Sequence, residues 1–200
     1  MEQLAKEYLI DFYTNRLMLH GDRPEALRWS PAGQIARYDA LSLISDSLHG
    51  KSVIDYGCGK GDLYAHWTSR KIRPQYTGID INPELIELAR LKYPECEFRV
   101  QDIEDSPLDR VFELGFICGV FNNRVEGATE SLKNSMRLLF ESVTEGLAVN
   151  AVSTKCTVRD IDINYVDHEE LLGYAGKHIT CNAEMRLDIV AGDIFLFLYR

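Results

Sequence analysis

Residues 53–63 read VIDYGCGKGDL, an apolar, β-branched run that leads into three alternating glycines. These glycines, Gly57, Gly59 and Gly61, stand between a short predicted strand and a predicted helix. Glycine lets the backbone turn sharply and lets a ligand approach without interference from a Cβ atom. The stretch therefore predicts a strand, a tight ligand-binding loop and a helix that begins near Asp62.

Short β-branched runs alternate with helical stretches downstream of Lys51. Five strands separated by helices are typical of a parallel, doubly wound sheet. Two more apolar runs close the chain, near enough in sequence to pair as an antiparallel hairpin. We therefore predict an α/β fold with a seven-stranded, mostly parallel sheet. The predicted strands cover residues 52–56, 75–80, 96–102, 112–120, 146–152, 178–189 and 193–200.

Short capping patterns between these strands predict where helices begin. Residues 82–93 read as a helix with Asn82 as its N-cap, and another helix is expected to end near Leu139. Asp167 with Glu170 three residues later forms a capping-box pattern. A helix is therefore expected to start at that point.

The first fifty residues read as two helices separated by a break. Leu4, Tyr8 and Phe12 recur at four-residue spacing, which places them on one helix face. Ser30 before a proline predicts the start of the second helix, and Gly50 predicts its end. This segment is expected to cover one side of the sheet.

Length and composition indicate one folded domain. The 200 residues are 46% hydrophobic and 26% charged, which is ordinary for a globular protein. We expect residues 1–50 to be a helical cover within the same domain as residues 51–200, which form the ligand-binding part. Asp and Glu (31) outnumber Lys and Arg (22), and the net charge of -9 repels phosphate backbones and anionic lipid. Nucleic acid is therefore an unfavourable partner, and no apolar run reaches the ~20 residues of a membrane helix.

Cysteine spacing and possible metal motifs bear on the cellular location and on metal binding. Five widely spaced cysteines without a CxxC pair suggest reduced thiols and a cytoplasmic location, and the N-terminus lacks the pattern of a secretory signal. Asp160, Asp162 and Asn164 have the opening spacing of a calcium loop. Tyr165 stands at the required glycine position and Leu171 at the required glutamate, so no metal is expected.

Three ligand classes use glycine loops of this kind. A dinucleotide fingerprint needs Gly or Ala where Asp62 stands, and that carboxylate would repel a pyrophosphate. The tripeptide GKS at 50–52 matches the end of a P-loop but precedes the strand. S-adenosylmethionine carries a sulfonium and an ammonium and no phosphate, so Asp55 and Asp62 suit its charge.

At these residues the sequence resembles the class I, Rossmann-like S-adenosylmethionine-dependent methyltransferases, strongly over residues 51–152. The resemblance implies S-adenosyl-L-methionine as cofactor. It implies that the glycine loop holds the methionyl part, that Asp80 reaches the ribose, that Asp102 accepts from the adenine amine and that the end of the fourth strand covers the methyl group. Glu104 and Asp105 are alternatives to Asp102. The expected cofactor residues are Arg37, Asp55, Gly57, Cys58, Gly59, Gly61, Asp80, Ile81, Asp102, Ile103, Cys118 and Gly119.

The acceptor is expected to be a small molecule, methylated by in-line displacement. An RNA or protein methyltransferase and a non-catalytic, cofactor-binding regulator are the alternatives. The sequence CGVF at 118–121 lacks the amino-methylating signature, and Cys118 lacks the preceding proline of a nucleophilic cysteine. Residues 153–166 are expected to form a lid or acceptor loop. The expected acceptor contacts are Tyr13, Trp29, Phe121 and Asn122, and weak candidates for a base are His20, Asp160 and His168.

Overall fold

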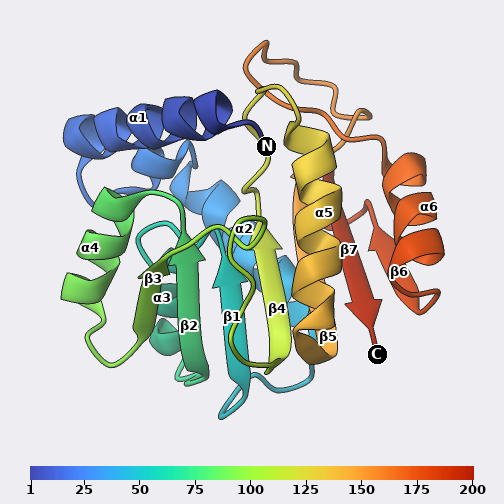
Figure 1. Ribbon diagram of the computed structural model, residues 1–200, viewed down its shortest axis with the longest axis horizontal. Coiled ribbons are helices and arrows are strands. Elements are labelled where there is room, and N and C mark those ends of the chain that lie inside the picture. The colour runs from blue at the N-terminus through green and yellow to red at the C-terminus, as the bar shows by residue number, and fades with distance from the viewer.

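A computed structural model describes residues 1–200. A seven-stranded sheet in the order β3-β2-β1-β4-β5-β7-β6 forms its centre, as Figure 1 shows in part. Strands β1 to β5 are parallel, whereas β7 runs antiparallel to both of its neighbours, β5 and β6. The strands are β1 (Ser52–Tyr56), β2 (Gln75–Asp80), β3 (Glu97–Val100), β4 (Phe112–Cys118), β5 (Val143–Val152), β6 (Ala183–Arg186) and β7 (Asp193–Tyr199).

Helices cover both faces of the sheet. Helices α2, α3 and α4 contribute Tyr38, Trp67 and Ile86 to one buried cluster. Helices α5 and α6 contribute Met136 and Leu171 to another cluster on the opposite face (Figure 1). The helices are α1 (Gln3–His20), α2 (Pro31–Leu41), α3 (Asp62–Ser69), α4 (Pro83–Lys92), α5 (Ala128–Glu141) and α6 (His168–His178), with short turns η1 (Pro24–Leu27) and η2 (Ser42–Ile44).

The strand order reverses between β1 and β4. From β1 the chain proceeds outward through β2 to β3, and then returns to the other side of β1 as β4. In open parallel sheets, ligands bind beside such a reversal at the carboxyl ends of the strands. Helix α1 crosses the molecule at this end of the sheet (Figure 1). The fold therefore creates a covered crevice where β1, β2 and β4 end.

The predicted fold class is confirmed, including the antiparallel pair at the end of the chain. All three predicted N-caps are present. Ser30 accepts from the Gly33 amide, Asn82 from the Glu84 amide and Asp167 from the Glu169 amide. The predicted end of the second helix is wrong. Helix α2 stops at Leu41, where the chain tightens into η2 and then becomes extended at Ser45.

The face of the first helix that carries Leu4, Tyr8 and Phe12 is not its most buried face. Leu4 is 79% exposed and Tyr8 is 56% exposed, whereas Lys6 and Leu9 are buried. The helix is turned this way because Lys6 pairs with Asp102 in the loop after β3. A polar contact and a second apolar row thus outweigh the regular spacing of the first row.

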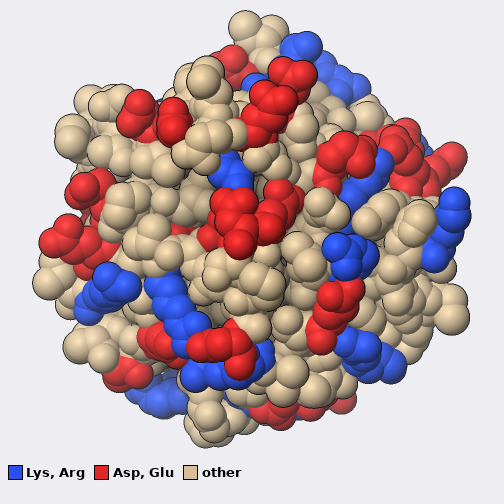
Figure 2. All heavy atoms as spheres, viewed as in Figure 1, with Lys and Arg blue, Asp and Glu red and all other residues tan.

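The surface carries charges of both signs. Figure 2 shows acidic and basic side chains interspersed on the face that carries α5 and α6, with acids gathered near its middle. This face offers no broad basic surface. None of the helices is both long enough and apolar enough to cross a lipid bilayer.

Candidate active site

A pocket of about 830 Å³, including its open mouth, lies where β1, β2 and β4 end. Helix α1 and the segment between η1 and α2 form its outer wall. Among the predicted site residues, the pocket is lined by Tyr13, Trp29, Gly57, Gly59, Asp80, Ile81, Asp102, Cys118, Gly119 and Phe121.

Other predicted site residues stand outside this lining. Cys58 and Ile103 are buried in the core, and Gly61 packs against Tyr93. Asn122 is buried one position beyond the lining residue Phe121. Asp55 and Arg37 are also absent from the lining. Asp55 contacts Tyr76, and Arg37 stacks on the lining residue Trp29. The three candidate bases, His20, Asp160 and His168, do not line the pocket either.

The glycine loop has the backbone conformation that its sequence requires. Gly57 has a φ of 72° and Gly59 a φ of 54°, values that side chains other than glycine rarely adopt. A Cβ atom at Gly57 would lie 2.3 Å from a methyl carbon of Val120. The loop can therefore pass close to the end of β4 only because this position lacks a side chain.

Asp80 ties the glycine loop to the end of β2. Its Oδ2 accepts from the Gly59 amide at 2.8 Å, and its Oδ1 accepts from the Asn82 amide at 2.9 Å. Burial raises the pKa of Asp80, and the backbone amides of Asn82, Gly59 and Ile81 oppose that increase. The carboxylate is thus fixed in orientation at the wall of the pocket.

Asp102 is held from three directions. Its Oδ1 accepts from the Tyr56 hydroxyl and from the Glu104 amide, each at 2.9 Å, and its Oδ2 lies 2.7 Å from Lys6 Nζ. Burial raises the pKa of Asp102, but these hydrogen bonds outweigh burial and keep the pKa below its usual value. Asp102 is therefore an ionised acceptor, and Lys6 links it to α1.

Asp55 lies behind the glycine loop rather than in the pocket. Its side chain is 2% exposed and accepts a hydrogen bond from the Tyr76 hydroxyl. Burial raises the pKa of Asp55 to about 7, with further increases from Asp80 and Asp62 and an opposing effect from Tyr76. A cation that binds in front of Asp55 would favour its ionised form.

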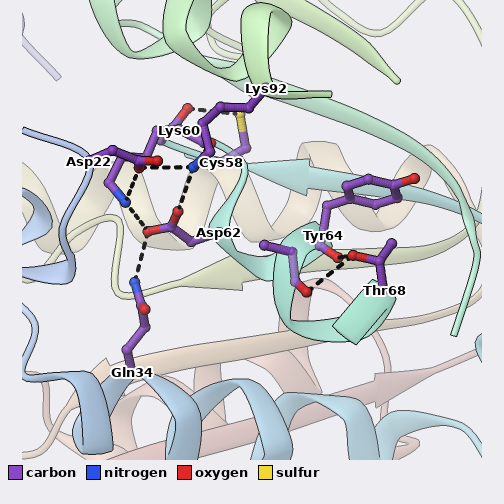
Figure 3. A network of polar contacts seen from close by, with 10 residues as sticks. Asp22, Gln34, Cys58, Lys60, Asp62, Tyr64, Thr68 and Lys92 are labelled. Atoms are coloured by element: carbon purple, nitrogen blue, oxygen red, sulfur yellow. Dashed lines mark hydrogen bonds and ion pairs between the residues drawn. The ribbon is translucent and has the colours of Figure 1, made fainter. Parts of the chain in front are cut away.

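Asp62 faces away from the pocket, contrary to the expected pairing with a ligand cation. It lies 2.6 Å from Lys60 Nζ and 3.3 Å from Lys92 Nζ, and it accepts from Gln34 at 3.0 Å. Asp22 completes the group by contacting both lysines (Figure 3). Asp62 thus neutralises a buried lysine and joins the glycine loop to α2 and α4.

Arg37 is engaged by the protein itself. Its guanidinium pairs with Asp193 at the start of β7, and it stacks over the Trp29 ring at 4.6 Å. Asp193 also accepts from the Asn150 side chain. Arg37 therefore supports Trp29, which lines the pocket, and does not line it directly.

The structure adds site residues that the sequence analysis missed. Lys6 and Tyr56 line the pocket and both contact Asp102. Tyr56 stands between Asp55 and Gly57, and alternation along β1 could have shown that it projects opposite to Asp55. No comparable sequence signal marks Lys6, whose partner lies 96 positions further along the chain.

Comparisons with known proteins find methyltransferases among the similar sequences and structures. A family model described as a methyltransferase domain matches residues 53–141. A putative methyltransferase of Mycobacterium tuberculosis, Rv1506c, is 28% identical over 123 residues, which cover 58% of this chain and 73% of the relative. The N-demethylindolmycin N-methyltransferase of Streptomyces griseus is 32% identical over 85 residues, or 42% of this chain and 35% of that enzyme. The chain thus spans most of the first relative but about a third of the second.

Solved structures extend the similarity to the whole fold. The crystal structure of magnesium protoporphyrin IX methyltransferase (ChlM) from Synechocystis PCC 6803 with bound SAH matches 98% of this chain and 99% of its own, with a TM-score of 0.69 and 15% identity. At that identity the match concerns the fold. Residues 53–141 thus match a methyltransferase domain, and the whole chain has the fold of the class I S-adenosylmethionine-dependent methyltransferases. S-adenosylmethionine is the cofactor of this class.

Proposed function

We propose that this protein transfers the methyl group of S-adenosylmethionine to a small-molecule acceptor in the pocket under α1. The observation that carries the proposal is the Gly59 to Asp80 hydrogen bond, which places a positive-φ glycine loop and a fixed carboxylate at the wall of one pocket. The relatives named as small-molecule methyltransferases support the acceptor class.

The lining fits the expected cofactor in charge. The carboxyl groups of Asp80, Asp102 and Glu104 line the pocket, with Lys6 paired to Asp102 and the Met1 amino group paired to Glu104, so the carboxyl groups outnumber the cations by one. Such a lining favours a ligand that carries positive charge and no phosphate. A dinucleotide would bring its pyrophosphate towards these carboxyl groups, and it would be repelled.

Each wall of the pocket would hold one part of the cofactor. Asp80 would accept hydrogen bonds from the ribose hydroxyls, with Ile81 packing beside the base. Asp102, kept ionised by Lys6, would accept from the adenine amine. The amides and Cα atoms of Gly57 and Gly59 would lie against the methionyl part, with Asp55 behind them as a buried countercharge.

When bound, the cofactor supplies an electrophilic methyl carbon whose C–S bond breaks as the acceptor attacks in line. The protein's contribution is to align the acceptor, which is worth up to roughly 7–11 kcal/mol in favourable cases. Trp29, Tyr13 and Phe121 line the pocket and would align the acceptor. Burial raises the pKa of Tyr13 to about 12, so Tyr13 can donate a hydrogen bond but is no base at neutral pH.

Calorimetric titration tests the cofactor assignment. We expect S-adenosylmethionine and its demethylated product to bind, and NAD to give no heat. Asp80→Ala should weaken both methionine nucleosides, whereas Asp46→Ala, at an exposed position outside the pocket, should leave them unchanged. Binding of NAD without a response to either methionine nucleoside would overturn the proposal.

A further inference from the structure

Arg28 has an unusual position at the edge of the pocket. It is one of two residues other than glycine with positive φ, at 63°, and its neighbours Leu27 and Trp29 both line the pocket. Such backbone conformations are uncommon and often occur at ligand sites. The turn sends the Arg28 side chain across to two other segments, where Nη1 donates to Asn123 Oδ1 at 2.9 Å and Nη2 to Asp160 Oδ2 at 3.0 Å.

Asn123 brings an unused donor to the same place. The residue is 6% exposed, and its Nδ2 is buried without a hydrogen-bond partner. Because a guanidinium has only donors, the atom facing Arg28 must be the Asn123 oxygen, which fixes where Nδ2 points. Nδ2 faces the Tyr13 hydroxyl and opposes the increase of the Tyr13 pKa, and Tyr13 lines the pocket. A buried donor left unpaired is destabilising, so an arriving acceptor atom would satisfy it.

Asp160 is the exchangeable member of this group. Its side chain is 50% exposed, so solvent screens its ion pair with Arg28 and the pair contributes little to stability. Asp160 belongs to the loop after β5, which backbone hydrogen bonds hold against the segment that follows β4. Asn164 N donates to Asn122 O, and Arg124 N donates to Asp162 O. The Arg28–Asp160 pair thus joins this loop to the residues between η1 and α2, next to the pocket.

We propose that Arg28, Asn123 and Tyr13 form a subsite for a carboxylate of the methyl acceptor, and that Asp160 takes the place of that carboxylate until the acceptor arrives. The inference rests on the proposed function, because it names the chemical class of its acceptor. A carboxylate has the planar shape that a guanidinium binds with two parallel hydrogen bonds. The single charge also matters, because the pocket lining has one more carboxyl group than cations and repels a doubly charged phosphate ester more strongly.

Titration of small anions into the protein loaded with S-adenosylhomocysteine tests the subsite. The probes are butyrate and benzoate, their primary amides, and phenyl phosphate. We expect the carboxylates to bind at least about tenfold more tightly than the amides and the phosphate ester, as one lost charge-assisted hydrogen bond requires. Equal binding of amides and carboxylates, or tighter binding of the phosphate, would contradict the proposal.

Two variants and a control locate the effect. Arg28→Gln should weaken carboxylate binding at least about tenfold. Asp160→Asn should strengthen it by up to about fivefold, because the internal competitor has lost its charge. Arg124→Gln, at an exposed arginine on the segment that meets the same loop, should change nothing.

The affinity for S-adenosylhomocysteine serves as the folding control in each variant. Unchanged carboxylate binding in Arg28→Gln, or no carboxylate binding to loaded wild-type protein, overturns the subsite while the proposed function stands. Failure of the wild-type protein to bind S-adenosylhomocysteine at all would instead count against the proposed function.

Discussion

The Gly59 amide donates to the Asp80 carboxylate across 2.8 Å, and the Asn82 amide occupies the other oxygen. This arrangement aligns the glycine loop with the end of β2 before any ligand binds. Asp80 lines the pocket and retains lone pairs for further donors. One side chain therefore both holds the loop and presents an acceptor.

Asp80→Ala should weaken S-adenosylmethionine binding by about 1.5–3 kcal/mol, because it removes a charged acceptor and frees the Gly59 amide. Asp80→Asn, which keeps one oxygen, should lose less. Calorimetry on folded variants measures both effects. Unchanged affinity in Asp80→Ala would place the ribose elsewhere.

The raised pKa of Asp55 predicts a pH-dependent stability. Because its pKa is about 7 in the folded protein and near 3.9 in the unfolded chain, the folded form holds the proton more tightly. Its contribution is fully present below about pH 4 and is lost as the pH rises towards 7. Asp55→Asn stays neutral at every pH. Relative to wild type, its free energy of unfolding should therefore increase by about 2–4 kcal/mol between pH 4 and pH 8, at 1.36 kcal/mol per pKa unit.

Urea denaturation of both proteins at several pH values measures that difference. Tyr76 can donate to an amide oxygen as it does to the carboxylate, so the variant keeps the local hydrogen bond. Parallel stability curves for the two proteins would show that Asp55 is ionised throughout.

Cys118→Ser should retain most of the methyl transfer. Cys118 lines the pocket, but burial raises the pKa of its thiol, Asp55 and Asp193 raise it further, and Arg37 does not compensate. The thiol is therefore protonated at neutral pH and a poor nucleophile. A complete loss of turnover with cofactor affinity intact would contradict this expectation.

The ion group around Lys60 should dominate the stability of the glycine loop. Lys60 is 2% exposed, and Asp62 is its nearest partner. Asp62→Ala leaves the buried Lys60 with the half-exposed Asp22 as its counter-ion, so the variant should reduce the free energy of unfolding by about 2–3 kcal/mol. Glu141→Ala, in the exposed pair with Arg137, is the control and should lose about 1 kcal/mol or less. Equal losses in the two variants would deny the ion group this role.

Local patterns predicted most of the fold. The bounds of β1 and β2 and the N-caps Ser30 and Asp167 follow from neighbouring residues alone. The orientation of α1 could not be predicted in this way, because Leu4 and Leu9 belong to two apolar rows of similar strength. The contact between Lys6 and Asp102 decides between these rows, and it joins residues far apart in sequence.

In the candidate site too, residues marked by local spacing could be predicted, and contacts that depend on the folded structure could not. Gly57, Gly59 and Asp80 stand out by spacing, and the structure brings them to one pocket. The partner of Asp62 could not be predicted, because the same carboxylate suits a ligand cation and a buried lysine equally well. Lys60 lies in the glycine loop and pairs with Asp62 at 2.6 Å, and neither residue lines the pocket.

The central claim is methyl transfer to a small molecule, and transfer of label tests it most directly. The protein is incubated with methyl-labelled S-adenosylmethionine and, side by side, a metabolite extract and total RNA, with Asp80→Ala as the control. We expect label in the small-molecule fraction, absent from the RNA and strongly reduced in the variant. Label that enters RNA alone, with a steep dependence on salt, would contradict the account.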